Sequence, residues 1–379
     1  MAIDKVTTAS IEDANITTAK LAYEAAPFRN IIINGDMSIA QRGASQASIT
    51  SSNYYTIDRI RTAINNGGTW TQSRSTEVPT GQGFATSLKM DCTTADTSLS
   101  SGDFLHVQIP IEAQMLQYLK YGTSSAETLT LSFWVRSNKT GTYCICLQKS
   151  DNTRYDFVAE YSISSADTWE KKTITIAPDS NIQAAGGAID NDSGEGMKLK
   201  FTLLSSGRTG TNNTWNSSTP ADATSNQVNL ADSTSNEWYI TGVQLEAGTT
   251  ASDFEFLPYD INRDRCYRYY YKVSSSGLKF VGWAQVDNDD VAVVAYIDFK
   301  TDMRVAPSAI ETTGSASNYQ VREALTYTCS AVPTFNSADL WYSTLSFKKS
   351  GITSSNGFAQ GELLKAGINS GYLAWSAEL

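Results

Sequence analysis

The segment that ends at Arg136 carries the two residues best suited to binding chemistry. In Leu129-Thr-Leu-Ser-Phe-Trp-Val-Arg136, successive side chains alternate, so Trp134 and Arg136 share one face of an extended chain. A tryptophan ring can stack on a sugar, and an arginine can donate hydrogen bonds to its hydroxyl groups. The pair predicts a glycan-binding platform. The alternative is that this strand packs inside a sandwich or an oligomer interface.

A tyrosine-rich segment, Cys266-Tyr-Arg-Tyr-Tyr-Tyr271, is the second candidate. Tyrosine and arginine concentrate binding energy at protein interfaces. On an extended chain the odd-numbered tyrosines would share one face, which predicts the first strand of a new domain. We expect a structural contact between subunits or domains here, with receptor contact as the other possibility. The interface candidates are Tyr267, Arg268, Tyr269, Tyr270 and Tyr271.

An acidic segment, Asp190-Asn-Asp-Ser-Gly-Glu195, places oxygen ligands at alternate positions beside a glycine. Calcium takes six to eight oxygen ligands, so Asp190, Asp192 and Glu195 are candidate calcium ligands. The full calcium-loop pattern is missing, because Phe201 stands at the twelfth position from Asp190. No other cofactor is expected.

Catalytic motifs are scarce. The sequence has no Gly-x-Ser-x-Gly elbow, no phosphate loop and no dinucleotide fingerprint. Its single histidine, His106, lies in an alternating segment and is expected to be structural. Glycoside hydrolysis needs only two well-placed carboxylates, and the chain has 39 acids, so a depolymerase is the enzymatic alternative. We expect a protein that is not an enzyme.

Composition narrows the class further. The 379 residues carry a net charge of −10 and no basic block, which argues against nucleic-acid binding. The longest aliphatic run is far shorter than the roughly 20 apolar residues of a membrane helix. The opening residues lack the apolar stretch of a secretory signal, so synthesis in a reducing cytoplasm is expected. Cys144 and Cys146 are then interpreted as small buried hydrophobes.

Abundant Ser, Thr, Asn and Gly together with 8 Trp, 19 Tyr and 13 Phe favour strands and turns, and so an all-β fold. One helix is expected over Ile111–Tyr121. The expected strands before residue 259 are Asn30–Asn34, Tyr54–Ile60, Phe84–Asp91, Phe104–Ile109, Thr128–Arg136, Tyr143–Lys149, Lys172–Ile176, Lys198–Leu204 and Trp238–Glu246. Those after it are Lys279–Val286, Val291–Phe299, Leu340–Phe347 and Tyr372–Ala377. The pattern predicts a jelly roll followed by a smaller β-sandwich domain.

Residues 1–28 differ from the rest. Val6-Thr-Thr-Ala-Ser-Ile11 recurs ten residues later as Ile16-Thr-Thr-Ala-Lys-Leu21. The apolar residues therefore recur every five positions, which matches neither a helix nor a strand. A lone segment of this length cannot bury Val6, Ile11, Ile16 and Leu21, so we expect an extended arm that docks on another chain.

Several motifs resemble those of one family. Phe28-Arg-Asn-Ile-Ile-Ile-Asn-Gly-Asp-Met-Ser-Ile-Ala-Gln-Arg-Gly43 and the following Tyr55-Thr-Ile-Asp-Arg59 resemble the opening of a domain common in tailed-phage tail fibre proteins. Three segments are similar to strands in the jelly rolls of carbohydrate-binding modules: the strand at Trp134, the later strand at Trp169, and Trp238-Tyr-Ile-Thr-Gly-Val-Gln-Leu-Glu-Ala-Gly248. The closing Ala374-Trp-Ser-Ala-Glu-Leu379 resembles the usual ending of the fibre family. The Thr-Thr-Ala repeats resemble anchoring segments in fibres of phages of marine bacteria and cyanobacteria.

The resemblance implies a virion protein made in the host cytoplasm and located in the tail fibre, usually a homotrimer. Residues 1–28 would anchor it to a tail, nozzle or adaptor protein. Residues 29–259 would form the jelly roll, and residues 260–379 an outward-facing β-domain. Attachment to a glycan or protein receptor on the host cell, without catalysis, nucleic acid or membrane insertion, is the expected function. The alternatives are a polysaccharide-degrading tailspike and a purely structural or head-decorating fibre.

Overall fold

The computed structural model describes residues 28–217, 220–274, 279–286, 292–322, 326–348, 358–363, 365–366 and 369–379. The predicted arm, with Val6, Ile11, Ile16 and Leu21, lies outside the described residues. The described chain forms two compact units, and the second begins at Pro258. It also includes Ile39–Gly43 and Thr56–Arg59, which the sequence assigned to the jelly roll.

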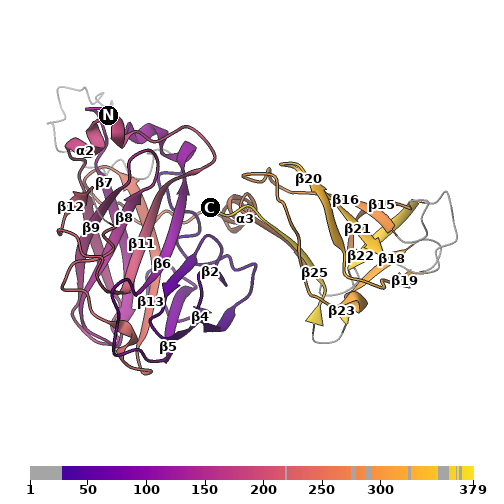
Figure 1. The fold of residues 1–379 in the computed structure, drawn as a ribbon, viewed down its shortest axis with the longest axis horizontal. Coiled ribbons are helices and arrows are strands. Elements are labelled where there is room, and N and C mark those ends of the chain that lie inside the picture. The colour runs from indigo at the N-terminus through magenta and orange to yellow at the C-terminus, as the bar shows by residue number, and fades with distance from the viewer. Residues whose placement is uncertain are drawn as a thin grey trace, which may run out of the picture. The chain divides into compact units, whose positions relative to one another are not determined.

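The first unit is an antiparallel two-sheet β-sandwich of the jelly-roll type (Figure 1). The first sheet has the order β1 (Ser45–Ile49), β4 (Thr69–Ser75), β5 (Ser87–Thr94), β13 (Glu237–Ala247), β7 (Leu129–Ser137) and β10 (Glu170–Ile176). The second has the order β12 (Thr214–Asn216), β9 (Tyr155–Ile163), β8 (Gly141–Lys149), β11 (Glu195–Ser205), β6 (Phe104–Glu112), β3 (Arg61–Asn65) and β2 (Asn53–Tyr54). Its one described α-helix is the short α2 (Ser180–Gln183), with 3₁₀ turns at Ala113–Leu119, Ala185–Gly187 and Leu230–Asp232.

The core of the first unit follows from period-two alternation. On β7, Leu129, Leu131, Phe133 and Val135 are fully buried, as the sequence predicts. The Phe133 ring meets those of Tyr161 on β9 and Phe201 on β11 at centroid distances of 5.1 and 5.0 Å. These edge-to-face contacts join the two sheets and leave the opposite face of β7 for other contacts.

The second unit is a smaller sandwich. One sheet has the order β14 (Tyr270–Ser274), β25 (Tyr372–Ser376) and β17 (Glu311–Thr312). The other has the order β19 (Thr326–Thr328), β18 (Tyr319–Arg322), β22 (Phe358–Leu363), β15 (Lys279–Val286), β16 (Ala292–Asp298), β21 (Tyr342–Lys348) and β20 (Thr334–Ala338). The remaining elements are the hairpin of β23 (Lys365–Ala366) and β24 (Asn369–Ser370), α3 (Tyr259–Tyr267) and a 3₁₀ turn at Ala316–Asn318.

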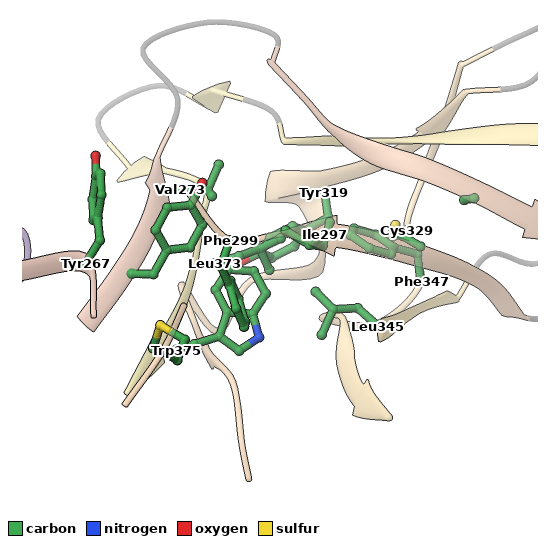
Figure 2. Close-up of a cluster of buried hydrophobic side chains, with 14 of the residues drawn as sticks. Tyr267, Val273, Ile297, Phe299, Tyr319, Cys329, Leu345, Phe347, Leu373 and Trp375 are labelled. Atoms are coloured by element: carbon green, nitrogen blue, oxygen red, sulfur yellow. The ribbon is translucent and has the colours of Figure 1, made fainter. Parts of the chain in front are cut away.

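Figure 2 shows the core of this second sandwich, where aromatic and aliphatic side chains from both sheets meet. The Trp375 ring on β25 lies 5.3 Å from that of Phe299 and 6.0 Å from that of Tyr271. The Tyr319 and Phe347 rings lie 6.4 Å apart on the facing sheet. The unit therefore has a hydrophobic core of its own.

Buried charges complete the second unit. Glu378 forms ion pairs with Arg42 and Arg59, whose guanidinium groups lie 3.6 Å from the ring centroids of Tyr270 and Tyr269. The side chain of Arg59 is 2% exposed and that of Glu378 is 4% exposed. Arg42 and Arg59 come from the two short early segments, so these segments are part of the second fold.

Three of the elements predicted before residue 259 are wrong. Asn30–Asn34 is a turn, because Asn34 adopts a φ of 62° before Gly35. Tyr54–Ile60 is strand only in β2, since Arg59 has a φ of 68° and its segment leaves for the second unit. The helix expected over Ile111–Tyr121 shortens to the 3₁₀ turn Ala113–Leu119, and Ile111 is part of β6.

Candidate functional site

A groove on the outer face of the first sheet is the best candidate site. Its volume is about 360 Å³. Aromatic rings supply one part of its lining and polar side chains the rest. The lining residues are Gly81, Gln82, Phe84, Ser132, Trp134, Lys171, Gly242, Asp253, Phe254 and Phe256.

Trp134 lines this groove from a central strand of the sheet. Its strand β7 is central in the sheet, where Trp134 is paired with Lys171 on β10 and with Thr241 on β13. Because Phe133 and Val135 point into the core, the half-buried indole of Trp134 points outward. Ser132, two residues earlier, lies on the same face and also lines the groove.

A bulge in β13 makes room beside the tryptophan. The register of β13 against β7 shifts between Thr241 and Gln244, and Gly242 there adopts a φ of 62°. A Cβ atom on Gly242 would lie 2.6 Å from Cζ of Phe84. Glycine is therefore required both by the backbone conformation and by the close approach of the Phe84 ring.

Three phenylalanines form the wall of the groove. The rings of Phe84, Phe254 and Phe256 lie within 4.9 to 5.1 Å of one another. Phe84 is buried, whereas Phe256 is 51% exposed. The wall thus offers an apolar surface that is fixed on its inner side and open to solvent on its outer side.

Hydrogen bonds fix the segment that carries Phe254 and Phe256. The buried Gln244 accepts from the backbone N–H of Glu255 (2.8 Å) and donates to the carbonyl of Asp253 (3.2 Å). Glu246 accepts from Ser252 through both its N–H (2.9 Å) and its Oγ (2.7 Å). The wall is therefore held before any ligand arrives, which limits the conformational entropy lost on binding.

Two sequence motifs meet at β13. Asn30 donates to the carbonyl of Val243 (3.1 Å) and accepts from the N–H of Leu245 (3.1 Å). A Cβ on Gly35 would lie 2.1 Å from the Val243 carbonyl oxygen, so only glycine fits there. The segment that begins at Phe28 thus packs on β13, which contains the predicted strand Trp238–Glu246 of the second motif.

Arg136 lies outside the groove. It pairs with Asp167 (2.9 Å) and Glu237 (3.4 Å), and its guanidinium lies 4.8 Å from the ring centroid of Tyr239. The structure therefore separates the two residues that the sequence combined into one platform. In the groove, the cation near the tryptophan is Lys171.

The acidic segment does not form a metal-binding cluster. Asp192 accepts from the N–H of Gly194 (2.8 Å), and Glu195 pairs with Lys198 (2.9 Å) and accepts from Ser150 (2.6 Å). Asp190 accepts from Asn152 (3.4 Å). Within the described ranges, no group of three or more His, Cys, Asp or Glu residues is arranged to hold a metal ion.

The tyrosine cluster lies inside the second unit. Tyr267 ends α3, where Asp260 in the first turn and Arg265 in the last favour a helix, so the strand predicted through Tyr267 is wrong. Tyr269, Tyr270 and Tyr271 lead into and form the start of β14. All four tyrosines are less than 9% exposed. Arg268 caps the helix and is half-buried.

A buried charge centre ties a long loop to the other sheet of the first unit. Asp222 pairs with Lys200 (2.7 Å) and Arg208 (2.6 Å), and its carboxylate lies 3.7 Å from Nε2 of His106. Burial lowers the pKa of His106 to about 3, so the ring is neutral near pH 7. His106 also stacks on Phe104 at 4.7 Å. This centre is structural.

A second cavity of about 500 Å³ opens beside the same loop. Its lining is hydroxyl- and amide-rich, but these groups bind one another: Glu160 accepts from Thr224 and from Asn226 (3.0 Å), and Asn216 donates to Asp156 (3.1 Å). No aromatic ring is among its described lining residues. The groove at Trp134 is therefore the better binding site.

Sequence reasoning found Trp134 but missed its partners in the groove. Lys171 and Phe84 carry no motif, and they reach Trp134 only through strand pairing and a bulge. The alternation Phe254-Glu-Phe256 was a usable signal, since it places two aromatic rings on one side of an extended chain. All five cysteines are buried and free, which confirms the prediction for Cys144 and Cys146. No helix in the described part of the chain is long and apolar enough to cross a membrane.

No protein-family model matches this sequence, and no curated protein matches it. One similar solved structure is the enzymatically active domain of tailspike protein 4 of bacteriophage CBA120, with 12% identity and a TM-score of 0.29 over 59% of this chain. The chain spans 22% of the length of that tailspike chain. Others are a putative sugar binding protein from Bacteroides thetaiotaomicron (12% identity, TM-score 0.30, 58% of this chain and 100% of that one) and a family 11 carbohydrate-binding module from Clostridium thermocellum (12%, 0.25, 55% and 99%).

Proposed function

We propose that this protein is a non-catalytic tail fibre of a tailed phage that recognises a glycan on the host cell surface through the groove at Trp134. The observation that carries the proposal is the position of Trp134, whose half-buried ring lines a groove of about 360 Å³ together with Lys171, Ser132 and Gln82.

The groove has the chemistry that a sugar requires. Its volume lies within the roughly 300 to 1,000 Å³ of typical ligand sites. The apolar face of a pyranose ring can stack on Trp134, and Phe256 borders the same space. Ser132, Gln82 and Lys171 offer hydrogen-bonding groups for hydroxyls at the edges of that ring.

Binding fits this groove better than hydrolysis. Glycoside hydrolases of the common type use two carboxyl groups about 5 to 10 Å apart, one as acid and one as nucleophile or base. Asp253 is the one acidic residue among the described lining residues of the groove. A glycan bound there would meet a single carboxylate, which supports recognition without cleavage.

The virion role rests on the sequence motifs. The opening motif from Phe28 to Gly43 resembles that of tailed-phage fibres and the motif from Trp238 to Gly248 resembles strands of carbohydrate-binding modules, and the groove depends on both through Asn30 and Gly242. Residues 1–28 would anchor the fibre to a tail or adaptor protein. Three copies in a homotrimer would raise the effective concentration of weak sites at the cell surface.

Glycan-array binding of the full chain tests this function. We expect wild type to bind a set of glycans, Trp134→Ala to lose them, and Tyr118→Ala to keep them. Tyr118 is a suitable control because it is an exposed aromatic residue of the same unit that does not line the groove. Unchanged binding by Trp134→Ala would contradict the proposal. Release of reducing sugar from a bound polysaccharide would instead support the depolymerase.

A further inference from the structure

Two charged side chains of the groove at Trp134 have no partner among the described residues. They are Lys171 on β10 and Asp253 in the segment that carries the aromatic wall, and both are exposed. Within the described part of the chain, neither side chain forms an ion pair or a hydrogen bond. The groove therefore offers one free cation and one free anion to a ligand.

The neighbouring charges do not cancel these two. The charged residues that lie within two positions of a lining residue are each held by another group. Glu170 pairs with Lys172 (2.6 Å), and Arg136 pairs with two acids outside the groove. Glu255 accepts hydrogen bonds from two backbone N–H groups of the opening motif, at 2.8 and 2.9 Å. A ligand in the groove would thus meet two charges of opposite sign.

The two charges lie on opposite sides of Trp134. In the order of the sheet, β7 has β10 on one side and β13 on the other. Lys171 is directly paired with Trp134, so both side chains project from the outer face. Asp253 is held over β13, because Gln244 of that strand donates to its carbonyl oxygen (3.2 Å). Since neighbouring strands lie about 4.8 Å apart, β10 and β13 are about 10 Å apart, with the indole between them.

The aromatic wall belongs to the acidic side of the groove. Phe254 and Phe256 follow Asp253 in the chain, and both of them line the groove. The face of an aromatic ring attracts a cation, and a carboxylate attracts the same cation by its charge. This side of the groove therefore suits an amino group, whereas the Lys171 side suits an acid group.

This arrangement distinguishes between sugars of different charge. A neutral sugar can hydrogen-bond to both groups, but hydrogen bonds between two ionised groups are stronger. A purely acidic sugar would meet Asp253 as well as Lys171, and the net charge of −10 on the chain repels it from a distance. A purely basic sugar would meet Lys171. A sugar with one amino and one acid group has no net charge and compensates both side chains.

We propose that the groove at Trp134 binds a zwitterionic sugar, with its ring on Trp134, its acid group at Lys171 and its amino group at Asp253. The inference rests on the proposed function, because it names the class of glycan that the same groove takes. Exposed ion pairs are individually weak, so each of the two contacts should change the affinity by about two- to fivefold.

Four sugars that share one pyranose ring test the proposal: glucose, glucosamine, glucuronic acid and 2-amino-2-deoxyglucuronic acid. Their binding to the full chain is measured by nuclear magnetic resonance titration at low salt. We expect the amino-uronic acid to bind wild type about two- to fivefold more tightly than either singly charged sugar. This preference should shrink at about 500 mM salt, which screens exposed charges.

Two variants assign the preference to its side chains. In Lys171→Gln, the amino-uronic acid should bind no more tightly than glucosamine, because the contact with the acid group is lost. In Asp253→Asn, it should bind no more tightly than glucuronic acid, because the contact with the amino group is lost. Lys172→Gln is the matched control, since Lys172 lies on the same strand but does not line the groove. It should keep the wild-type preference.

Equal affinity of wild type for glucose and the amino-uronic acid would overturn the inference while leaving the glycan groove intact. Tightest binding of glucuronic acid or of glucosamine, or no binding of any of the four, would overturn it as well. So would a Lys172→Gln variant that loses the preference, because the effect would then come from overall charge. The glycan array with Trp134→Ala tests the proposed function separately. Circular dichroism checks that each variant folds.

Discussion

Both units carry aromatic rings on the outer face of a sheet, yet the surroundings of those rings differ. In the first unit, the segments that carry Phe84 and Phe256 fold over the sheet beside Trp134 and leave a groove of about 360 Å³. In the second unit, Trp283 and Tyr296 are mostly exposed. Aromatic composition alone therefore does not identify a partner. A ring enclosed in a groove suits a small ligand, whereas rings exposed on an open sheet face suit another surface.

The two units also bury charge differently. In the first, Asp222 pairs with Lys200 and with the partly exposed Arg208, 22 and 14 positions away, and lies 3.7 Å from Nε2 of His106. The second encloses Glu378 with Arg42 and Arg59, residues 336 and 319 positions away. The first centre fixes a loop on its own sheet, whereas the second joins the two early segments to the end of the chain.

The largest expected effect concerns the second charge centre. Glu378→Ala removes the carboxylate that compensates Arg42 and Arg59, and leaving buried charges without a partner costs about 3 to 5 kcal/mol. Calorimetry should show the melting transition of the second unit falling or disappearing while that of the first is kept. Ser376→Ala, an exposed change on the neighbouring strand, is the control. Equal destabilisation of both units would show that they do not melt separately.

Lowering the pH from 7 to 5 should lower the stability of the first unit and raise that of the second. The folded pKa of His106 is about 3, below its usual value near 6.5, so the first unit loses stability as the pH falls through 6.5. From pH 7 to pH 5 this loss is about 2 kcal/mol. In the second unit, burial raises the pKa of Asp58 to about 6, so the folded state binds a proton first and gains about 1 kcal/mol at pH 5.

Thermal scans at pH 7 and pH 5 measure this divergence. His106→Gln should reduce the change in the first unit's melting temperature between pH 7 and pH 5. Asp58→Asn should reduce the corresponding change in the second unit. Parallel shifts of both transitions in wild type would contradict the assignment of these two groups.

A smaller effect is expected at the bulge beside the groove. Gly242→Ala places a Cβ 2.6 Å from Phe84 on a backbone with a φ of 62°, which costs about 1 to 2 kcal/mol. Both the stability and the glycan affinity should fall, because the Phe84 ring must shift to make room for the added Cβ atom. Gly248→Ala is the matched control: its φ is also positive, at 118°, but nothing lies within 4 Å of its added Cβ. Unchanged glycan affinity in Gly242→Ala would show that the wall does not contribute.

The sequence predicted what depends on local alternation and missed what depends on distant contacts. The alternation of apolar and polar residues predicted the strand β7 and the outward position of Trp134. Its neighbours Leu131, Phe133 and Val135 are buried, so Trp134 lies on the opposite face. The apolar run Ile31 to Ile33 suggested a strand, but left-handed Asn34 and Met37 turn the chain there. The assignment of Arg42 and Arg59 to the second unit was beyond local reasoning, since their partner Glu378 lies more than 300 residues away.

The same limit applies to the candidate site. Arg136 was paired with Trp134 because both share a strand face, yet acids on neighbouring segments, Asp167 and Glu237, hold its guanidinium elsewhere. The cation beside Trp134 is instead Lys171, which the register of β10 against β7 places there. No pattern within Glu170–Ile176 reveals that register. A single sequence therefore predicts that Trp134 faces outward, but the residues beside it follow from strand pairing that the sequence does not show.

Calorimetric titration of the strongest glycan from the array into wild type, Trp134→Ala and Tyr118→Ala tests the central claim most directly. The loss of one stacking ring should weaken binding by at least tenfold, about 1.4 kcal/mol, in Trp134→Ala, and leave Tyr118→Ala equal to wild type. A Trp134→Ala variant that melts like wild type and binds the glycan with unchanged affinity would contradict the account.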